Sequence, residues 1–329
     1  MKKGVKLLIL LLVLALVAGG LFAVTRYNAK QESLNHSEEE IIAAAIDKAE
    51  VAAIRWTNDK NDISLSKDEK GYWHYDGDPT LPLDNAVPEG MLNSVSSLIA
   101  TRLVAENPAD TAQYGFNKPG CTAVFTMKDG SQTTLTIGNE SGYDSVYFKS
   151  SDSANVYLVS SDIETTFSKS VTDLVKAETF PTCETIPSVT VQGEKTTVIF
   201  TAEPAKEDDA QTAFTVSSGD KKGTLTPEHA AALESEINGL KFGSCAAYKG
   251  ETEKFGLAKP AYRITVNYTN DSKDGSFTLL LGNKTEEGMY YAMLQGSDCI
   301  FTLAQSSVNT LTEDDITAFC TKEPTTTTN

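Results

Sequence analysis

Histidine is rare in this sequence of 329 residues: only three are present, and none stands in a motif that a histidine-dependent enzyme uses. The GxSxG, HExxH, Walker and GxGxxG signatures of common enzymes are also missing. His74 stands between two aromatic residues, where it is either a ligand contact or, more simply, a half-exposed strand histidine. We therefore predict that the protein is not an enzyme and binds no cofactor or metal ion.

Cysteine is scarce and scattered. The chain has five cysteines, an odd number, with no CxxC pair and no Cys/His spacing of the kind that holds zinc. Isolated buried thiols explain this pattern better than a disulfide framework does, although an oxidising compartment would permit one pair.

Positive charge is in short supply as well, with 28 lysines and arginines against 45 acidic residues and a formal net charge of −17. The first thirty residues hold five of the cations and no acid, so the rest of the chain is more acidic still. A nucleic-acid interface needs a basic face, and this composition therefore argues against nucleic acid as a partner.

One long apolar run stands near the N-terminus. Val5–Val24 is apolar apart from Lys6 near its start, and about twenty residues at about 1.5 Å each span a hydrocarbon core of about 30 Å. A cleaved signal peptide is the alternative, but its apolar core is usually only about 7–15 residues long. We predict a cytoplasmic tip and transmembrane anchor over residues 1–27, which would contact membrane lipid. Lys2, Lys3 and Lys6, before or at the start of the run, favour a cytoplasmic N-terminus, a single-pass cell-membrane protein and an extracytoplasmic main part.

The two ends of the remaining chain differ from its middle. Residues 28–49 are polar, then rich in alanine and isoleucine with helical preference, and we predict a stalk there. Residues 321–329 are of low complexity, and we predict a disordered tail.

The middle of the chain repeats itself at an offset of 141 to 144 residues. Tyr114–Pro119 and Phe255–Pro260 share the pattern aromatic-Gly-x-x-Lys-Pro, and Cys121–Asn139 matches Ala261–Asn283, across which the offset grows by three residues at the turn. Two copies of one folding unit are therefore expected.

Two prolines break regular structure at the joint between the copies, at Pro181 and Pro187. We accordingly predict a first α+β repeat unit over residues 50–184 and a second over residues 185–320.

Each unit combines hairpin signals with one amphipathic helix. Asp129-Gly130 and Asp274-Gly275 stand between alternating strands, as hairpin turns do. Apolar residues recur at helical spacing before each hairpin: Met91, Leu92, Val95, Leu98 and Ile99 in the first unit, and Ala230, Leu233, Ile237 and Leu240 in the second. The expected fold class is α+β, an N-terminal transmembrane helix followed by two tandem β-rich units, each an antiparallel sheet with one helix.

Lys118 and Lys259 are the candidate partner contacts, because one lysine recurs at the same place in both units. Inheritance of turn chemistry is the competing explanation. Gly115 and Gly256 can adopt positive φ, and the proline after each lysine favours an extended backbone.

Six motifs stand in an order that carries a family resemblance: Tyr72-Trp73, Leu81-Pro82-Leu83-Asp84, Tyr114-Gly115-Phe116 with Pro119, Asp129-Gly130, Ile137-Gly138 and Val156-Tyr157-Leu158-Val159. This order resembles the bacterial domain of unknown function 4340, a family of membrane-anchored extracytoplasmic proteins. The resemblance covers residues 50–315, and the second unit departs from it by lacking a clear tryptophan. Proteins that look like this are often encoded beside transport systems of the gliding-motility ABC type, which implies an accessory role. It implies no catalytic residues.

The leading hypothesis is a non-enzymatic binding or accessory module that serves an ABC-type transport system by contacting its subunits or an envelope component. Exposed strand edges would suit such contacts. A cell-envelope hydrolase or glycan-modifying enzyme is one alternative, and it would need carboxylates or a nucleophile that converge in a cleft. A structural spacer is the other.

Overall fold

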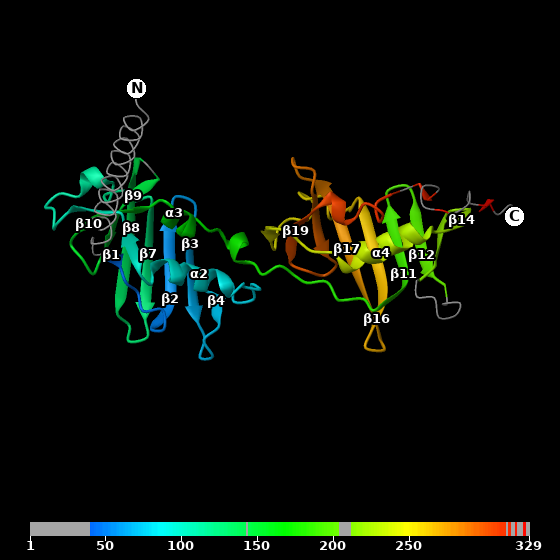
Figure 1. Cartoon of the computed structure of the whole chain (residues 1–329), viewed down its shortest axis with the longest axis horizontal. Coiled ribbons are helices and arrows are strands. Elements are labelled where there is room, and N and C mark those ends of the chain that lie inside the picture. Colours follow the sequence, from blue (N-terminus) through cyan, green and yellow to red (C-terminus); the bar gives the residue numbers. More distant parts are fainter. Residues whose placement is uncertain are drawn as a thin grey trace, which may run out of the picture.

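The computed structural model describes residues 40–142, 144–203, 212–313, 315–316, 320 and 325–326. Antiparallel strands dominate these residues and form two large sheets and one small ribbon. The two large sheets belong to two units that lie next to each other along the length of the molecule (Figure 1). The first unit contains β1 to β10 and the second β11 to β20.

The first sheet has eight strands, and in its central strands buried side chains alternate with less buried ones. In β2, for example, Val51, Ile54 and Trp56 are buried, and in β7 Ala123 and Phe125 are buried in alternation with less buried residues. The strands lie in this order: β4 (Trp73–Tyr75), β3 (Asp62–Lys67), β2 (Val51–Asn58), β7 (Cys121–Met127), β8 (Gln132–Gly142), β9 (Ser145–Ser150), β10 (Val156–Ser160) and β6 (Arg102–Ala105).

The second sheet repeats this order strand for strand, with two additions at one edge. Its strands are β15 (Cys245–Tyr248), β19 (Cys299–Leu303), β18 (Tyr290–Leu294), β17 (Lys273–Lys284), β16 (Tyr262–Asn270), β11 (Thr185–Gly193), β12 (Thr197–Ala202), β13 (Phe214–Ser218), β14 (Lys221–Thr224) and β20 (Thr325–Thr326). β15 thus corresponds to β6, and β13 to β4. The repeat seen in the sequence is therefore also a repeat of sheet topology.

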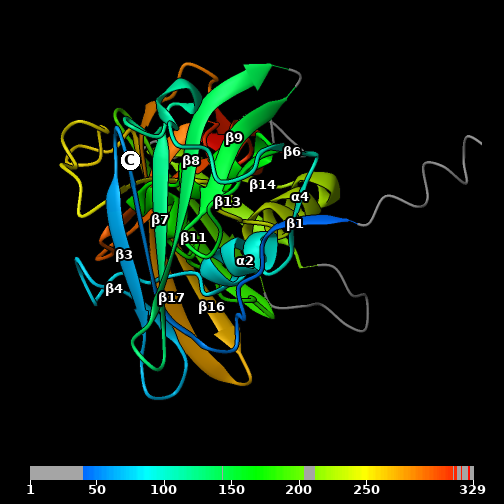
Figure 2. The same ribbon diagram turned by 90° about the vertical axis from the view of Figure 1, so that its left-hand side faces the viewer.

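One helix of ten or more residues packs against each sheet. α2 (Ala86–Val95) buries Met91, Leu92 and Val95 in the first core, on one side of the sheet (Figure 2). α4 (Pro227–Asn238) buries its apolar face in the second core. Thr226 caps α4 by accepting a hydrogen bond from the His229 amide at 3.2 Å, and proline is suited to the first helical turn that follows.

The described residues also contain shorter helical segments. They are α3 (Asp162–Phe167) and the three 3-10 helices Ala112–Tyr114, Val171–Leu174 and Gln305–Ser307.

The first helix is shorter than its apolar spacing predicted. α2 ends at Val95, and Leu98 and Ile99 belong instead to β5 (Leu98–Ala100). Near the end of α2 the Ser94 hydroxyl donates to the helix backbone, at 2.9 Å from the Met91 carbonyl. Such side-chain bonds compete with helix propagation, and β-branched Ile99 gains a strand partner. The second predicted helix is nearly right, since Leu240 lies buried just beyond α4.

The expected helical preference at the end of the stalk is wrong for residues 41–44. Ile41–Ala44 forms β1, which pairs with β5 in a two-stranded ribbon, and Ala43 and Ala44 are buried in the first core. Tertiary burial and two consecutive β-branched residues outweigh the helix propensity of alanine.

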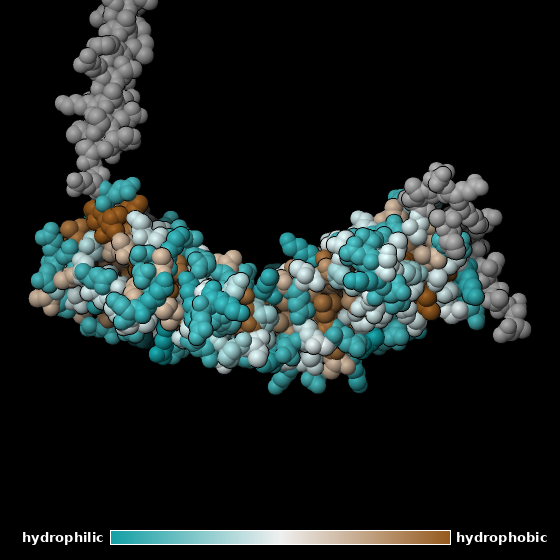
Figure 3. Space-filling model, turned by 90° about the horizontal axis from the view of Figure 1, so that it is seen from below, coloured by the Kyte–Doolittle hydropathy of each residue, from teal (hydrophilic) through white to brown (hydrophobic). Residues whose placement is uncertain are grey.

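This ribbon carries three exposed isoleucines. Ile41, Ile42 and Ile99 are 39%, 42% and 47% exposed, and Ile42 lies directly opposite Ile99. Figure 3 shows a hydrophobic patch on the surface of the first unit. The ribbon therefore leaves apolar surface uncovered by the other described residues.

The two hairpins differ in where they turn. The turn at Asp129-Gly130 is confirmed, with Gly130 at a φ of 86°. In the second unit the turn lies at Asp271-Ser272, both with positive φ, and not at Asp274-Gly275. Positive φ at both central residues is the geometry of a two-residue hairpin turn.

Gly275 has a packing function instead. It lies opposite Tyr268 in β16, and a Cβ atom there would stand 2.5 Å from the Tyr268 ring. The glycine thus leaves room for an aromatic ring across the strand pair.

The expected fold class requires correction. The three α-helices of the described residues have 10, 6 and 12 residues, so this part of the chain is mostly β-sheet and not of the α+β class. None of its helices is long and apolar enough to cross a membrane, and an N-terminal transmembrane helix receives no support. The anchor expected over residues 1–27 lies outside the described residues, and the cell-membrane location stays a prediction.

The predicted disordered tail, residues 321–329, is described only at β20, which pairs with β14. A short strand therefore stands where irregular structure was expected.

Candidate functional site

The aromatic-Gly-x-x-Lys-Pro motifs, residues 114–119 and 255–260, form the same turn in both units, and we call them the aromatic-Gly turns. Gly115 and Gly256 have φ of 85° and 73°, as expected for left-handed backbone. A Cβ atom on either glycine would overlap the side-chain oxygen of an asparagine in the neighbouring strand, Asn139 or Asn283. Glycine is therefore required at this point by conformation and by space.

A second glycine in each unit lies in the sheet and also allows this close approach of the turn. A Cβ atom on Gly138 would overlap the Tyr114 carbonyl oxygen, and one on Gly282 would overlap that of Phe255. In the second unit the Asn283 amide donates to the Phe255 carbonyl at 2.8 Å. The Ile-Gly-Asn and Leu-Gly-Asn segments stood in the repeat alignment, but the sequence did not show which turn they contact.

Aromatic rings fix each turn on the outer face of its sheet. Tyr114 packs on Tyr147 with ring centroids 5.0 Å apart, and Phe255 packs on Tyr291 at 4.9 Å. Phe255 also belongs to a small buried cluster with Leu257 and strand residues of the second sheet. The two turns are therefore firmly positioned copies of one structure.

Lys118 and Lys259 occupy equivalent and exposed positions at the ends of these turns. Neither ammonium group has a hydrogen bond or ion pair with another described residue. The structure does not bring the two lysines together, because each belongs to its own unit. It does place each in the same local surroundings, which the sequence pattern had indicated.

A second lysine accompanies each turn, and the sequence did not single it out. The Lys149 ammonium lies 4.9 Å from the Phe116 ring centroid, and the Lys254 ammonium lies 5.6 Å from that of Phe255. An ammonium group thus lies over an aromatic ring of each turn, from Lys149 of β9 in the first unit and from Lys254, directly before the turn, in the second. Such a surface can attract carboxylate or other anionic groups of a partner.

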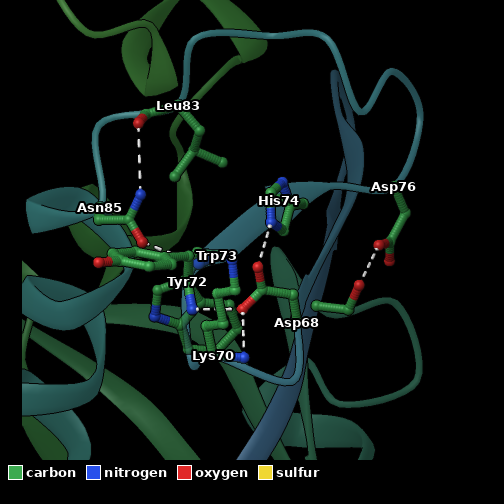
Figure 4. Close-up of polar contacts among 9 residues, drawn as sticks. Asp68, Lys70, Tyr72, Trp73, His74, Asp76, Leu83 and Asn85 are labelled. Atoms are coloured by element: carbon green, nitrogen blue, oxygen red, sulfur yellow. Dashed lines mark hydrogen bonds and ion pairs between the residues drawn. The ribbon is translucent and has the colours of Figure 1, made fainter.

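His74 was the other residue considered, and it lies in the β3–β4 hairpin (Figure 4). Its Nε2 atom stands 3.2 Å from the Asp68 carboxylate, which also accepts hydrogen bonds from the Tyr72 and Lys70 amides at 2.8 and 2.9 Å. The Tyr72 amide, followed by His74, lowers the pKa of Asp68 below its ordinary value. His74 is 44% exposed and helps to close the hairpin turn.

A nucleophile–histidine pair does not form in this hairpin. Ser66 lies directly opposite His74 in the strand register, but its hydroxyl donates to Asp76 at 2.5 Å, as the Ser64 hydroxyl also does. A serine nucleophile would need its hydroxyl bonded to the imidazole. The arrangement seen here stabilises the hairpin.

Trp73 links the same hairpin to α2. Its indole donates to Glu89 at 2.8 Å, and the Lys67 ammonium lies 3.4 Å from the same carboxylate and 4.6 Å from the indole ring. The indole bond is the main cause of a lowered Glu89 pKa. The Trp73 backbone amide donates to the Asn85 side-chain oxygen at 2.8 Å. Asn85 thus occupies part of the outer edge of β4.

Metal and thiol chemistry have little basis in the described residues. No group of three or more His, Cys, Asp and Glu side chains among them is arranged to hold a metal ion. All five cysteines are unpaired thiols. Burial raises the pKa of Cys121 and of Cys245 to about 12 and that of Cys299 to about 11, so these thiols stay protonated near neutral pH.

The fold and the turns define a duplicated, mostly β protein whose two units share one sheet topology and one aromatic-Gly turn. The chain belongs to the family described as Domain of unknown function (DUF4340), whose model matches residues 73–242 and 225–322. This confirms the family resemblance seen in the sequence, while the match does not show membrane anchoring. No curated protein and no solved structure matches the chain.

Proposed function

We propose that the chain is a non-enzymatic binding module that contacts acidic groups of a partner protein through its two aromatic-Gly turns. One observation carries this proposal. Lys118 and Lys259 are exposed at the same place on the same firmly packed turn in both units.

The contacts of the turn argue against simple inheritance of the lysine. Gly115 and Gly256 are needed because their neighbours leave no room for a side chain. The proline after each lysine favours an extended backbone for any residue type at the lysine position. Nothing in the described surroundings of Lys118 or Lys259 calls for lysine, so its presence in both copies is better explained by a contact outside the unit.

Positioned turns suit binding for a further reason. A contact surface that is already ordered loses little conformational entropy when the partner arrives. Two such surfaces on one chain make the second contact intramolecular, which raises the overall affinity without new types of contact.

The proposed partner is a subunit of an ABC-type transport system, for which the chain would be an accessory protein. The family resemblance supports this proposal, because similar proteins are often encoded beside such systems. The absence of an enzymatic function is likewise a proposal. Its support is that the Ser66 hydroxyl is bonded to Asp76 and not to His74.

Site-specific photo-crosslinking in cells tests the proposal. A photoreactive amino acid is placed at position 118 or 259 of the full chain, and in control chains at position 60 or 195. Lys60 and Lys195 are exposed lysines in the equivalent β2–β3 and β11–β12 turns, so they match the test positions in charge and in repetition. We expect one transporter subunit to crosslink from positions 118 and 259 and not from the controls. Equal yields from all four positions, or no protein crosslink from any, would contradict the proposal and favour a spacer.

A further inference from the structure

Four polar side chains connect the two units. The Lys249 ammonium donates to the Asp78 carboxylate at 2.7 Å and to the Thr80 hydroxyl at 3.1 Å. The Tyr248 hydroxyl donates to the same Asp78 oxygen at 3.2 Å and lies 3.0 Å from the Thr80 hydroxyl. We call Asp78, Thr80, Tyr248 and Lys249 the junction clamp.

Asp78 is held in place for this contact within its own unit. Its Oδ1 atom accepts hydrogen bonds from the Thr80 amide at 3.0 Å and the Thr80 hydroxyl at 2.7 Å, which leaves Oδ2 to face the second unit. The Lys249 ammonium is the main cause of a strongly lowered Asp78 pKa, so the carboxylate is ionised at neutral pH. The first unit therefore presents a fixed negative charge to the second.

Two apolar side chains add to this contact. Tyr248 and Val175 are the two partly buried apolar residues that pack against the cores of both units. Units joined largely by polar contacts are expected to move relative to each other unless specific bonds hold them. The junction clamp supplies such bonds.

The chain that joins the units is fixed on both sides of a single residue. On the first unit, the Lys176 amide donates to the Pro82 carbonyl at 2.7 Å. On the second unit, Glu178 accepts a hydrogen bond from the Ser297 hydroxyl at 2.5 Å, and the Phe180 ring packs on Phe242 at 4.7 Å. Ala177 lies between these attachments and is the natural hinge.

Comparison of the two units shows that the clamp is specific to the junction. β6 corresponds to β15, and alignment through their partner strands places Glu106-Asn107 where the second unit has Tyr248-Lys249. The backbone is alike, since Asn107 and Lys249 have φ of 40° and 51°. The duplicated turn has thus kept its shape, while the side chains differ at the place that meets the other unit.

We propose that the junction clamp is an electrostatic latch that holds the two units in one orientation, and that opening it lets them rotate about Ala177. The latch would set the distance between Lys118 and Lys259. This inference goes beyond the proposed binding function and does not depend on it, because its test needs no partner.

The test measures the distance distribution between the units by single-molecule fluorescence energy transfer on the full chain in detergent. Dyes are attached through non-natural amino acids at Glu69 and Glu194, which are exposed turn residues of the first and second unit. The variants are Asp78→Asn and Lys249→Met. The control is Asp62→Asn, which removes an exposed ion pair of the same 2.7 Å length, Arg55–Asp62, within the first unit.

We expect one narrow distribution for the unmodified chain and for Asp62→Asn, and a broadened or shifted one for both clamp variants. Raising the salt concentration from about 0.1 M to about 1 M shortens the screening length from about 10 Å to about 3 Å. It should therefore broaden the distance distribution of the unmodified chain in the same way. This salt measurement needs no variant. A broad distribution at low salt, or clamp variants that keep the narrow one, would overturn the proposal.

Discussion

Single glycine residues decide how closely each aromatic-Gly turn approaches its sheet. Gly115 meets Asn139 and Gly138 meets the Tyr114 backbone, and the second unit repeats both contacts with Gly256 and Gly282. The sequence indicated positive φ at the turn glycines, and the structure confirms it. The sequence could not indicate the contact between the turn and the Gly-Asn segment, because this contact depends on how distant strands pair.

Substitution of a turn glycine by alanine should destabilise the protein. Gly115→Ala places a Cβ atom in left-handed backbone against the Asn139 side chain, and we expect a loss of roughly 1–3 kcal/mol in the free energy of unfolding. Gly90→Ala in α2 is the control, since no atom lies within 4 Å of the added carbon and alanine is favoured in helices by about 0.5–1 kcal/mol. Urea unfolding measures both. Equal effects of the two substitutions would contradict this account of the turn.

Strands and helices were predictable where burial alternates within a short segment. β7 and β8, on either side of Asp129-Gly130, were indicated by the sequence for that reason, and α4 was indicated by the helical spacing of its apolar residues. The misses come from pairing between distant segments. β1 pairs with β5 across more than fifty residues, and no local pattern shows that Leu98 and Ile99 will leave the helix.

The β16–β17 hairpin offers a test of the corrected turn. Ser272 has a φ of 59°, and left-handed backbone costs a residue other than glycine roughly 1–2 kcal/mol, so Ser272→Gly should stabilise the protein. Gly275→Ala should destabilise it, because the new carbon would lie 2.5 Å from the Tyr268 ring. Thermal unfolding of both variants and of the unmodified chain shows whether each substitution raises or lowers the stability. If Ser272→Gly lowered the stability and Gly275→Ala raised it, the turn would lie at Asp274-Gly275 instead.

At the scale of the whole molecule, two separate cores account for most of the buried apolar residues. Both tryptophans, Trp56 and Trp73, belong to the first core. Tryptophan fluorescence therefore reports the unfolding of the first unit, whereas circular dichroism reports both. The duplication was visible in the sequence because the turn residues recur at a nearly constant offset, and so were the β-rich units, but the α+β class was wrong because the helices of the described residues are few and short.

Equivalent helix substitutions should separate the two units. Leu92 in α2 and Leu233 in α4 are both fully buried, and replacing either by alanine should cost about 2–5 kcal/mol. We expect Leu92→Ala to lower the urea midpoint seen by fluorescence, and Leu233→Ala to lower only the midpoint seen by circular dichroism. If both substitutions lowered the fluorescence midpoint equally, the units would unfold as one.

The central claim is that the two aromatic-Gly turns bind one acidic partner. Its most direct test is quantitative recovery of the partner identified by crosslinking, using the full chain with Lys118→Ala and Lys259→Ala together against the matched Lys60→Ala and Lys195→Ala pair. A charge-assisted hydrogen bond is worth about 1.5–3 kcal/mol, so we predict a loss of about tenfold or more in affinity for the first pair. The second pair should bind as the unmodified chain does. Equal binding by both double variants would contradict the claim.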